Sequence, residues 1–268
     1  MSKKLFFIGS GNMTQAIISG ILEARLVARE NIICNDTIKE KLLNLRQKFG
    51  VSITDDKGKG VLFADIIVLS VKPQNMIELL SEIKNLIKGE TIIISIAAGI
   101  TTKFIENNVL QDTAVIRAMP NTSALVLSSV TALCKGKFVS NVQLQEAKHL
   151  FSAIGKVKIL DEEKFDVITA LSGSGTGYIF YFCELMQKAA KKLGLDEETA
   201  REFAVQTVYG SGKMLYITRE SPKILKERVK SPNGTTEAAL NYFDSENFSD
   251  IVYGAMKRAM ERSKELSK

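Results

Sequence analysis

The sequence has 268 residues, of which 45% are hydrophobic and 25% charged, a composition typical of a folded globular protein with one large or two modest domains. Its formal net charge is +6 and its basic residues are dispersed, which predicts no nucleic-acid interface and only a mild attraction for small anionic substrates. The longest apolar runs, such as Ile92–Ile100, are too short to cross a membrane, and the run that follows MSKK is too short for a signal peptide.

The cysteines and the single histidine limit the kinds of functional site that we expect. The three cysteines, Cys34, Cys134 and Cys183, are far apart, which is typical of neither a disulfide framework nor a metal site. We therefore expect no metal, and reduced, buried thiols in the cytoplasm. The single histidine, His149, lies in a helical stretch, and we interpret it as a surface or structural residue rather than as a catalytic acid.

Short apolar segments alternate with helical ones through the first part of the chain. The expected helices there are 13–24, 38–49, 75–87 and 102–108. Because the strand segments are nearly continuous in Ile, Val and Leu, we expect both faces of their sheet to be covered. Strand–helix alternation predicts a mostly parallel sheet with right-handed crossovers. The expected strands are Leu5–Ile8, Ile32–Asn35, Ile66–Val71, Thr91–Ala97, Ala114–Arg117, Val130–Cys134 and Val157–Leu160.

After about Leu160 the strand pattern stops, which predicts a domain boundary between residues 1–160 and 161–268. The segment Tyr178–Met186 is apolar almost all round and must be buried, for which a partner subunit is one solution. Gly210 and Gly212 lie inside a predicted helix, where each costs about 1 kcal/mol and indicates close packing. Helices are predicted over 165–170, 177–193, 197–217, 223–228, 236–243 and 248–263.

A nucleotide-binding pattern lies in LFFIGSGNMT (5–14), where a strand precedes G-x-G-x-x-T and a helix follows it. Gly9 permits the tight turn, Gly11 lets the backbone approach a pyrophosphate, and the helix N-terminus supplies amide donors. Thr14 stands where Gly or Ala is usual, and we expect it to weaken helix–strand packing slightly. In this context the pattern predicts a dinucleotide-binding Rossmann domain.

The second predicted strand ends in Asn35 and Asp36, where an acid often holds the ribose hydroxyls of NAD. Asp36 would repel the 2′-phosphate of NADP, whereas Asn35, Thr37 and Lys39 could accommodate it, so the choice of NAD or NADP stays open. The turns at Val71-Lys72-Pro73 and Ala97-Ala98-Gly99 end the next two strands, where an open α/β sheet places its ligand. Taken singly, each turn is equally well explained as an ordinary loop.

Further segments carry a family resemblance: RAMPNT (117–122), ALSGSG (170–175), TVYGSGKML (207–215) and SPNGTT (231–236). Together with FIGSGNM and the VKP turn, they make the chain resemble pyrroline-5-carboxylate reductase in order from Phe7 to Leu266. The resemblance implies reduction of 1-pyrroline-5-carboxylate to L-proline with NADPH or NADH. It also implies a Rossmann domain followed by an all-α dimerisation and substrate-binding domain, and a homodimer that can assemble into a decamer.

The resemblance implies site residues as well. Thr236 would hydrogen-bond the pyrroline ring and is the catalytic candidate, in a substrate-binding set of Met119, Ser231, Gly234, Thr235 and Thr236. The cofactor contacts carried over are Ile8, Gly9, Ser10, Gly11, Asn12, Met13, Ser70, Val71, Lys72, Pro73, Ile96, Ala97 and Ala98, to which the strand argument adds Asn35 and Asp36.

Two residues of the SPNGTT region depart from the family pattern. Asn233 replaces a glycine but tolerates positive φ, and Lys230 replaces a small hydroxyl residue. From the residues alone, Thr235-Thr236 also fits a helix N-cap, and both interpretations can hold together. The proton donor stays open, because an imine that binds already protonated needs no strong acid.

Two rival functions remain. Dehydrogenases of the 3-hydroxyacid type typically place a lysine about one helical turn after a Ser-Gly motif, and SGSG here is followed by no such lysine. A nucleotide-sensing module without turnover would not need the turn at 231–236.

Overall fold

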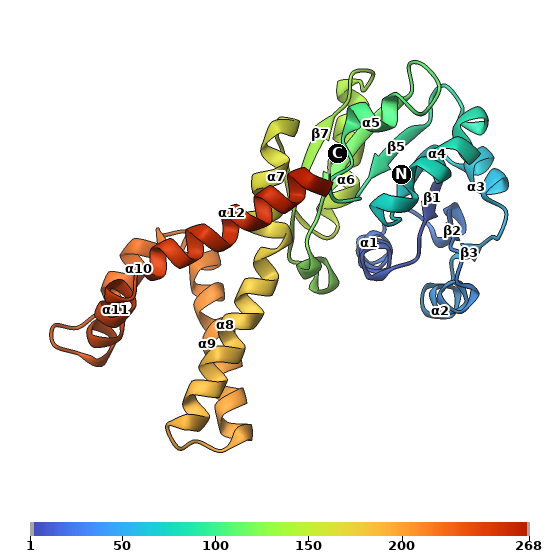
Figure 1. Cartoon of the computed structure of the whole chain (residues 1–268). Helices are drawn as coiled ribbons and strands as arrows, with labels where there is room; N and C mark the ends of the chain where they lie inside the picture. Colours follow the sequence, from blue (N-terminus) through green and yellow to red (C-terminus); the bar gives the residue numbers. More distant parts are fainter. Residues whose placement is uncertain (1–2, 267–268) are drawn as a thin grey trace. The chain divides into compact units, whose positions relative to one another are not determined.

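A mixed sheet forms the centre of the first part of the computed structural model, which describes residues 3–266. Within those residues the sheet has eight strands in the order β3-β2-β1-β4-β5-β6-β7-β8. Strands β1 to β6 are parallel, β7 runs antiparallel to β6, and β8 runs parallel to β7 (Figure 1). The strands are β1 Leu5–Ile8, β2 Ile32–Asn35, β3 Ser52–Ile53, β4 Ile66–Leu69, β5 Ile92–Ser95, β6 Ala114–Met119, β7 Ser129–Lys135 and β8 Gly155–Ile159.

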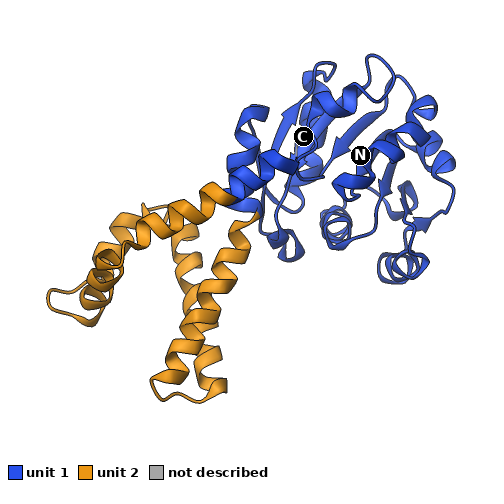
Figure 2. Cartoon of the chain, in the orientation of Figure 1, with its two compact units in different colours: residues 1–173, 259–268 blue, residues 174–258 orange. Residues whose placement is uncertain are grey.

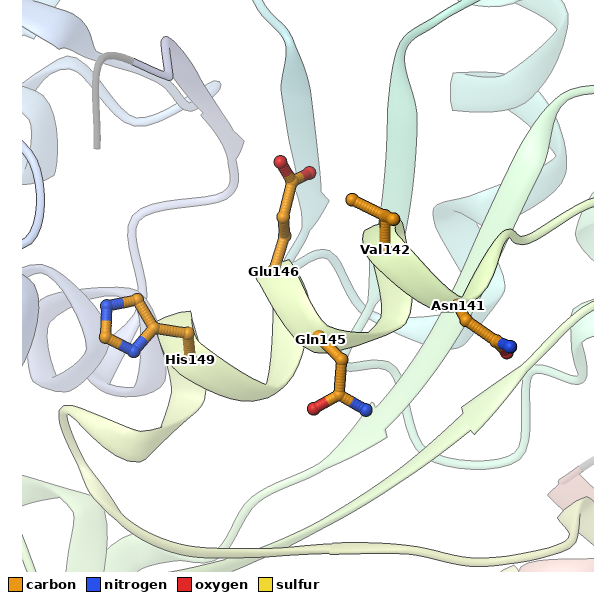
Figure 3. Close-up of a pocket in the computed structure, with 5 residues that line it drawn as sticks. All are labelled: Asn141, Val142, Gln145, Glu146 and His149. Atoms are coloured by element: carbon orange, nitrogen blue, oxygen red, sulfur yellow. The ribbon is translucent and has the colours of Figure 1, made fainter.

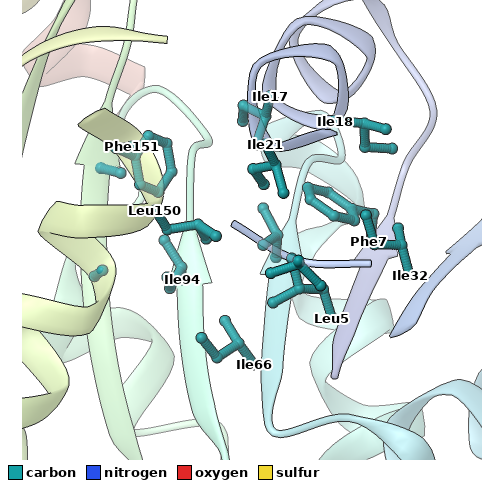
Figure 4. Close-up of a cluster of buried hydrophobic side chains, with 14 of the residues drawn as sticks. Leu5, Phe7, Ile17, Ile18, Ile21, Ile32, Ile66, Ile94, Leu150 and Phe151 are labelled. Atoms are coloured by element: carbon teal, nitrogen blue, oxygen red, sulfur yellow. The ribbon is translucent and has the colours of Figure 1, made fainter. Parts of the chain in front are cut away.

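Both faces of this sheet are covered, as the apolar strands predict. Side chains alternate across the pleat, so Leu5 and Phe7 join one buried cluster while Phe6 and Ile8 join another. The first cluster takes in α1, α2 and α6, and Figure 4 shows Ile21 of α1 among the side chains gathered around β1. The second takes in α3, α4 and α5. The helices are α1 Asn12–Glu23, α2 Lys39–Phe49, α3 Lys57–Phe63, α4 Met76–Ile83, α5 Thr102–Glu106 and α6 Asn141–Ser152.

Among the strands and α-helices, the short strand β3 and the helix α3 have no counterpart in the sequence prediction. Helix α3 has the sequence KGKGVLF, and two glycines in seven residues lower its intrinsic helix propensity. Packing explains one of them, because a Cβ on Gly60 would lie 2.2 Å from the Phe6 ring of β1. The Asp56 side chain accepts a hydrogen bond from Lys59 N and caps this helix, and that cap is its local sequence signal.

The remainder of the chain is helical. Here α7 (Phe165–Ile168) continues into a π-helical turn at Thr169–Gly173. The long helices that follow are α8 Gly175–Lys192, α9 Glu197–Thr218, α10 Pro222–Val229, α11 Thr235–Ser245 and α12 Phe248–Leu266.

The described chain separates into two compact units (Figure 2). Residues up to Gly173 and from Ala259 form the first, and residues 174–258 form the second. The last turns of α12 therefore belong to the first unit, where Ser263 Oγ donates a 2.7 Å hydrogen bond to Asp166 Oδ1. These compact units are defined by contacts within the chain, and the predicted domain boundary after residue 160 stays a prediction.

The second unit has almost no core of its own. Among its described residues, only Ala200 and Ala204 are hydrophobic and buried. Phe180 on α8 is 68% exposed, although it lies in the segment whose sequence demands burial. A Cβ on Gly210 or Gly212 would meet no atom within 4 Å, so the close packing that these glycines indicate does not occur within this chain.

Candidate functional site

The loop between β1 and α1 has the conformation that the glycine pattern predicts. Gly9 has a φ of +103°, and its N–H donates a 2.8 Å hydrogen bond to Asn35 O at the end of β2. A Cβ at this position would lie 2.3 Å from Ser70 O, so only glycine fits between the loop and the turn after β4. The loop is thereby held against the ends of two neighbouring strands.

Thr14 of α1 holds the same loop in place through hydrogen bonds that the sequence did not predict. Its buried Oγ1 lies 2.8 Å from Gly9 O and 2.8 Å from Ser70 Oγ. Because a hydroxyl carries one hydrogen, Thr14 donates to the carbonyl and accepts from Ser70. The threonine therefore cross-links the loop to the turn after β4, and the slight weakening of helix–strand packing stays a prediction.

The start of α1 is suited to an anionic group. Gly11 is the N-cap residue, no side chain caps the helix, and its first turn holds no acidic residue. A Cβ on Gly11 would meet no atom within 4 Å, so packing within this chain does not require the glycine. Open space beside Gly11, at the positive end of a helix without a side-chain cap, fits a pyrophosphate.

Asp36 stands beside this loop, at the end of β2. Its Oδ2 accepts hydrogen bonds from Ser10 N at 2.7 Å and from Ser10 Oγ at 2.6 Å, and its Oδ1 accepts one from Ile38 N at 2.9 Å. Burial raises the pKa of the carboxyl, but the hydrogen bonds from Ser10 and Ile38 and the charge of Lys41 outweigh burial and lower it overall. Asp36 is therefore ionised at neutral pH.

The remaining candidate cofactor residues lie at the same edge of the sheet. Ser70–Pro73 follow β4, which pairs with β1, and Ile96–Ala98 follow β5, which pairs with β4. The strand order reverses direction at β1, with β2 on one side and β4 on the other. In open α/β sheets the ligand lies outside the carboxyl ends of the strands at such a switch point. The structure thus brings the predicted cofactor residues together.

Met119 ends β6, the next strand of this edge. The Met119 Cε atom lies 2.6 Å from the position that a Cβ on Gly173 would take, so the MPNT segment lies against the π-helical turn. Asn121 reinforces this contact, because its Nδ2 donates to Ser172 Oγ at 3.0 Å. The two motifs singled out at 117–122 and 170–175 are therefore neighbours within the first unit, a pairing that the sequence did not predict.

The SPNGTT segment connects α10 to α11 in the second unit. Asn233 has a φ of +56°, which confirms that asparagine supports the left-handed backbone here. Gly234 N donates a 2.9 Å hydrogen bond to Ser231 O and closes the turn. Gly234 is the N-cap residue of α11 and no side chain caps this helix, so the interpretation of Thr235-Thr236 as a helix cap is wrong.

Two charged residues, Glu237 and Lys230, hold this turn in place. Glu237 Oε2 accepts a 2.7 Å hydrogen bond from Asn233 N. Lys230 Nζ lies 3.3 Å from Glu227 Oε2 and 3.8 Å from Glu237 Oε1, so it joins the end of α10 to the start of α11. Sequence reasoning missed Glu237, although a glutamate three residues after a helix N-cap often bonds back to the backbone at the start of the helix; here it bonds Asn233, the residue before the N-cap.

His149 is exposed on α6. It lines a surface hollow with Asn141, Val142, Gln145 and Glu146, and Figure 3 shows all five side chains along α6. Because one helix supplies the whole lining, no second element positions a reactant there. Burial raises the pKa of Cys34 and of Cys134 to about 12, which leaves both thiols unreactive at neutral pH. Residues 3–266 contain no cluster of side chains that could hold a metal ion.

Comparison with known proteins agrees with both halves of this description. Residues 162–266 match a family model described as pyrroline-5-carboxylate reductase dimerisation, and residues 4–99 match one described as NADP oxidoreductase, coenzyme F420-dependent. Pyrroline-5-carboxylate reductase 1 of Bacillus spizizenii is 36% identical over 99% of this chain and 90% of its own length.

Solved structures agree in the same way. A pyrroline-5-carboxylate reductase from Coxiella burnetii superposes with a TM-score of 0.92 at 36% identity and covers 100% of both chains. The Plasmodium falciparum pyrroline carboxylate reductase with NADP bound superposes with a TM-score of 0.89 at 28% identity, over 99% of this chain and 98% of the other.

Proposed function

Because the chain belongs to the pyrroline-5-carboxylate reductase family, we propose that it reduces 1-pyrroline-5-carboxylate to L-proline with NAD(P)H. Full-length similarity to named reductases supports the reaction. The single structural observation that supports it best is the loop at Gly9–Gly11, which is held by hydrogen bonds and leads into α1, a helix without a side-chain cap and with open space beside Gly11. This reaction is the last step of proline biosynthesis.

The first unit would hold the dinucleotide. The backbone of Ile8–Met13 would bind the pyrophosphate, and Asn35 with Asp36 would meet the ribose next to the adenine. The turns at Ser70–Pro73 and Ile96–Ala98 would line the rest of the cofactor. When bound, the reduced nicotinamide supplies the hydride that converts the C=N bond to an amine. The protein itself would contribute by holding the loop, the turns and Met119 at one edge of the sheet.

The second unit would hold the substrate in the turn between α10 and α11. The first turn of α11 offers amides without a side-chain cap, which suit the carboxylate of a cyclic imino acid, and Lys230 offsets the charge of Glu237 in that turn. Ser231, Gly234 and Thr235 would shape the binding turn, and Thr236, which is only half-buried, would direct its hydroxyl to the ring nitrogen. That hydrogen bond would orient the imine and stabilise the change of charge on nitrogen during reduction.

We also propose a homodimer formed through the second unit, and assembly of dimers into a decamer. The dimerisation family model over 162–266 and the large apolar side chains exposed on α8, α9 and α12 support the dimer. Cytoplasmic localisation is proposed because all three cysteines are free thiols, which a reducing compartment maintains. No helix within residues 3–266 has the length and apolar character that crossing a bilayer requires.

The direct test follows the consumption of NADH and of NADPH by the purified chain with 1-pyrroline-5-carboxylate, and identifies the product as proline. We expect turnover with at least one of the two nucleotides. Substrates of the 3-oxoacid type serve as the comparison, because turnover of those alone would assign the chain to another class of dehydrogenase. Nucleotide binding without turnover of either substrate would instead support a sensing module.

A further inference from the structure

We infer that Asp36 makes this chain select NADH over NADPH, through a carboxylate that faces the glycine loop where the adenosine ribose must lie. The inference rests on the proposed function, since it concerns the cofactor of the same reaction. It assigns a specificity-determining role to Asp36 and predicts a preference that differs from the NADP named for one matching family model and bound in the Plasmodium falciparum structure.

The position of Asp36 is fixed by the backbone of two strands. Asn35 is the register partner of Ile8, and Gly9 N donates to Asn35 O at 2.8 Å. Asp36, the next residue, reaches Ser10 in the middle of the glycine loop through two hydrogen bonds. A dinucleotide whose pyrophosphate lies on this loop therefore presents its adenosine ribose to Asp36.

The hydrogen-bonding capacity of the carboxylate matches a free ribose. An ionised carboxylate has about four acceptor positions and no donor. Ser10 N and Ser10 Oγ use two of them, and Ile38 N uses a third. The remaining position on Oδ1 can accept a ribose hydroxyl, and rotation of the Ser10 hydroxyl releases a second. A 2′-phosphate carries only acceptors at neutral pH and gains nothing from this arrangement.

The charges around Asp36 point in the same direction. The carboxylate is ionised at neutral pH, because its hydrogen bonds and Lys41 lower its pKa. Among the described residues, no lysine or arginine forms an ion pair with it, and Lys39 and Lys41 are exposed on the first turn of α2. Solvent screens exposed lysines, so they offset little of the repulsion that a neighbouring carboxylate exerts on a phosphate.

The test measures dissociation constants for NADH and NADPH by nucleotide fluorescence, with no substrate present. We expect the wild-type chain to bind NADH at least about tenfold more tightly than NADPH, the scale of one unfavourable charge pair near a protein surface. Asp36→Asn keeps the shape and removes the charge, and should lower this preference by about tenfold or more. Glu40→Gln removes the same charge from the exposed first turn of α2 and should leave the preference unchanged.

Two controls separate selectivity from damage to the loop. Ser10→Ala removes one hydrogen bond to Asp36 but keeps the charge, so it should weaken both nucleotides alike and preserve the preference. Circular dichroism checks that each variant is folded.

Equal or tighter binding of NADPH by the wild-type chain would overturn the inference, as would an unchanged preference in Asp36→Asn. Failure to bind either nucleotide would be a different result, because it removes the cofactor site of the proposed function itself.

Discussion

The two units of this chain differ in how they bury apolar surface. In the first, side chains on both faces of the sheet are enclosed by helices of the same chain, and Phe6, Phe7 and Phe151 have no exposed surface. In the second, Phe180, Tyr216 and Tyr253 are each about two-thirds exposed. The first unit is thus stabilised by its own core, whereas the second requires a surface from outside the chain. The overall hydrophobic content of the sequence is ordinary, yet one unit buries its apolar side chains within the chain and the other leaves them exposed.

The largest expected effect tests the core of the first unit. Ile21→Ala removes a fully buried side chain of α1 and should lower the free energy of unfolding by about 2–5 kcal/mol, because the cavity cannot fully collapse. Ile77→Ala, in which the replaced side chain is 55% exposed on α4, is the matched control and should change stability little. Chemical denaturation followed by circular dichroism measures both. Equal losses would show that the enclosed core does not dominate the stability of this unit.

The next effect tests the exposed surface of the second unit. Phe180→Glu should weaken self-association at least about tenfold, because it places a charge in an apolar interface, and should leave the first unit folded. Val142→Glu is the control, since Val142 is 70% exposed on α6 of the first unit and Phe180 is 68% exposed. Light scattering across a concentration series reports the oligomeric state. A dimer unchanged by Phe180→Glu would contradict the proposed interface.

A smaller effect separates the chemical roles of the two units. Thr236→Ala should lower kcat about tenfold or more with unchanged nucleotide affinity, the scale of one oriented hydrogen bond at a reacting centre. Ser245→Ala removes a hydroxyl from the other end of α11 and should leave turnover unchanged. Steady-state kinetics give kcat, and nucleotide fluorescence gives the affinity. Near wild-type turnover in Thr236→Ala would remove this residue from the mechanism.

The smallest effect concerns acid stability of the glycine loop. Because the pKa of Asp36 is lowered in the folded chain, its contribution to stability is present above the unfolded pKa of about 4 and is lost as pH falls through the lower folded value. Asp36→Asn lacks this contribution, so the stability difference between wild type and variant should shrink as pH falls below about 4. Thermal melting at several pH values tests this. A difference that stays constant in acid would show that the Asp36 charge contributes nothing to folding.

Sequence patterns predicted the elements whose signals are local. The β1–loop–α1 segment was predicted because Gly9 indicates a tight turn and Gly11 indicates open space beside the backbone. Helix α3 escaped prediction because Gly60 is required by the Phe6 ring, a contact between residues far apart in the sequence. Helix propensity shows only that Gly60 destabilises the helix, whereas the packing of the folded chain shows why a glycine is needed there.

The candidate site shows the same limit. The positions of Asp36, Ser70 and Ile96–Ala98 followed from where parallel strands end, a rule of topology. The hydrogen bonds that Thr14 and Asp36 make to the glycine loop depend on side-chain geometry that no spacing rule contains. The cap assigned to Thr235-Thr236 was wrong because the backbone of Gly234 already provides the N-cap of α11.

The hydrogen bond between Ser263 and Asp166 has a consequence for biosynthesis. Ribosomes extend the chain from its N-terminus, so the last turns of α12 emerge only after every residue of the second unit has been made. The first unit includes those turns, and a Cβ on Gly99 would lie 2.7 Å from Leu266 O at their end. The first unit therefore stays unfinished until the whole second unit has been made, and a chain arrested within the second unit would lack the segment that completes the first.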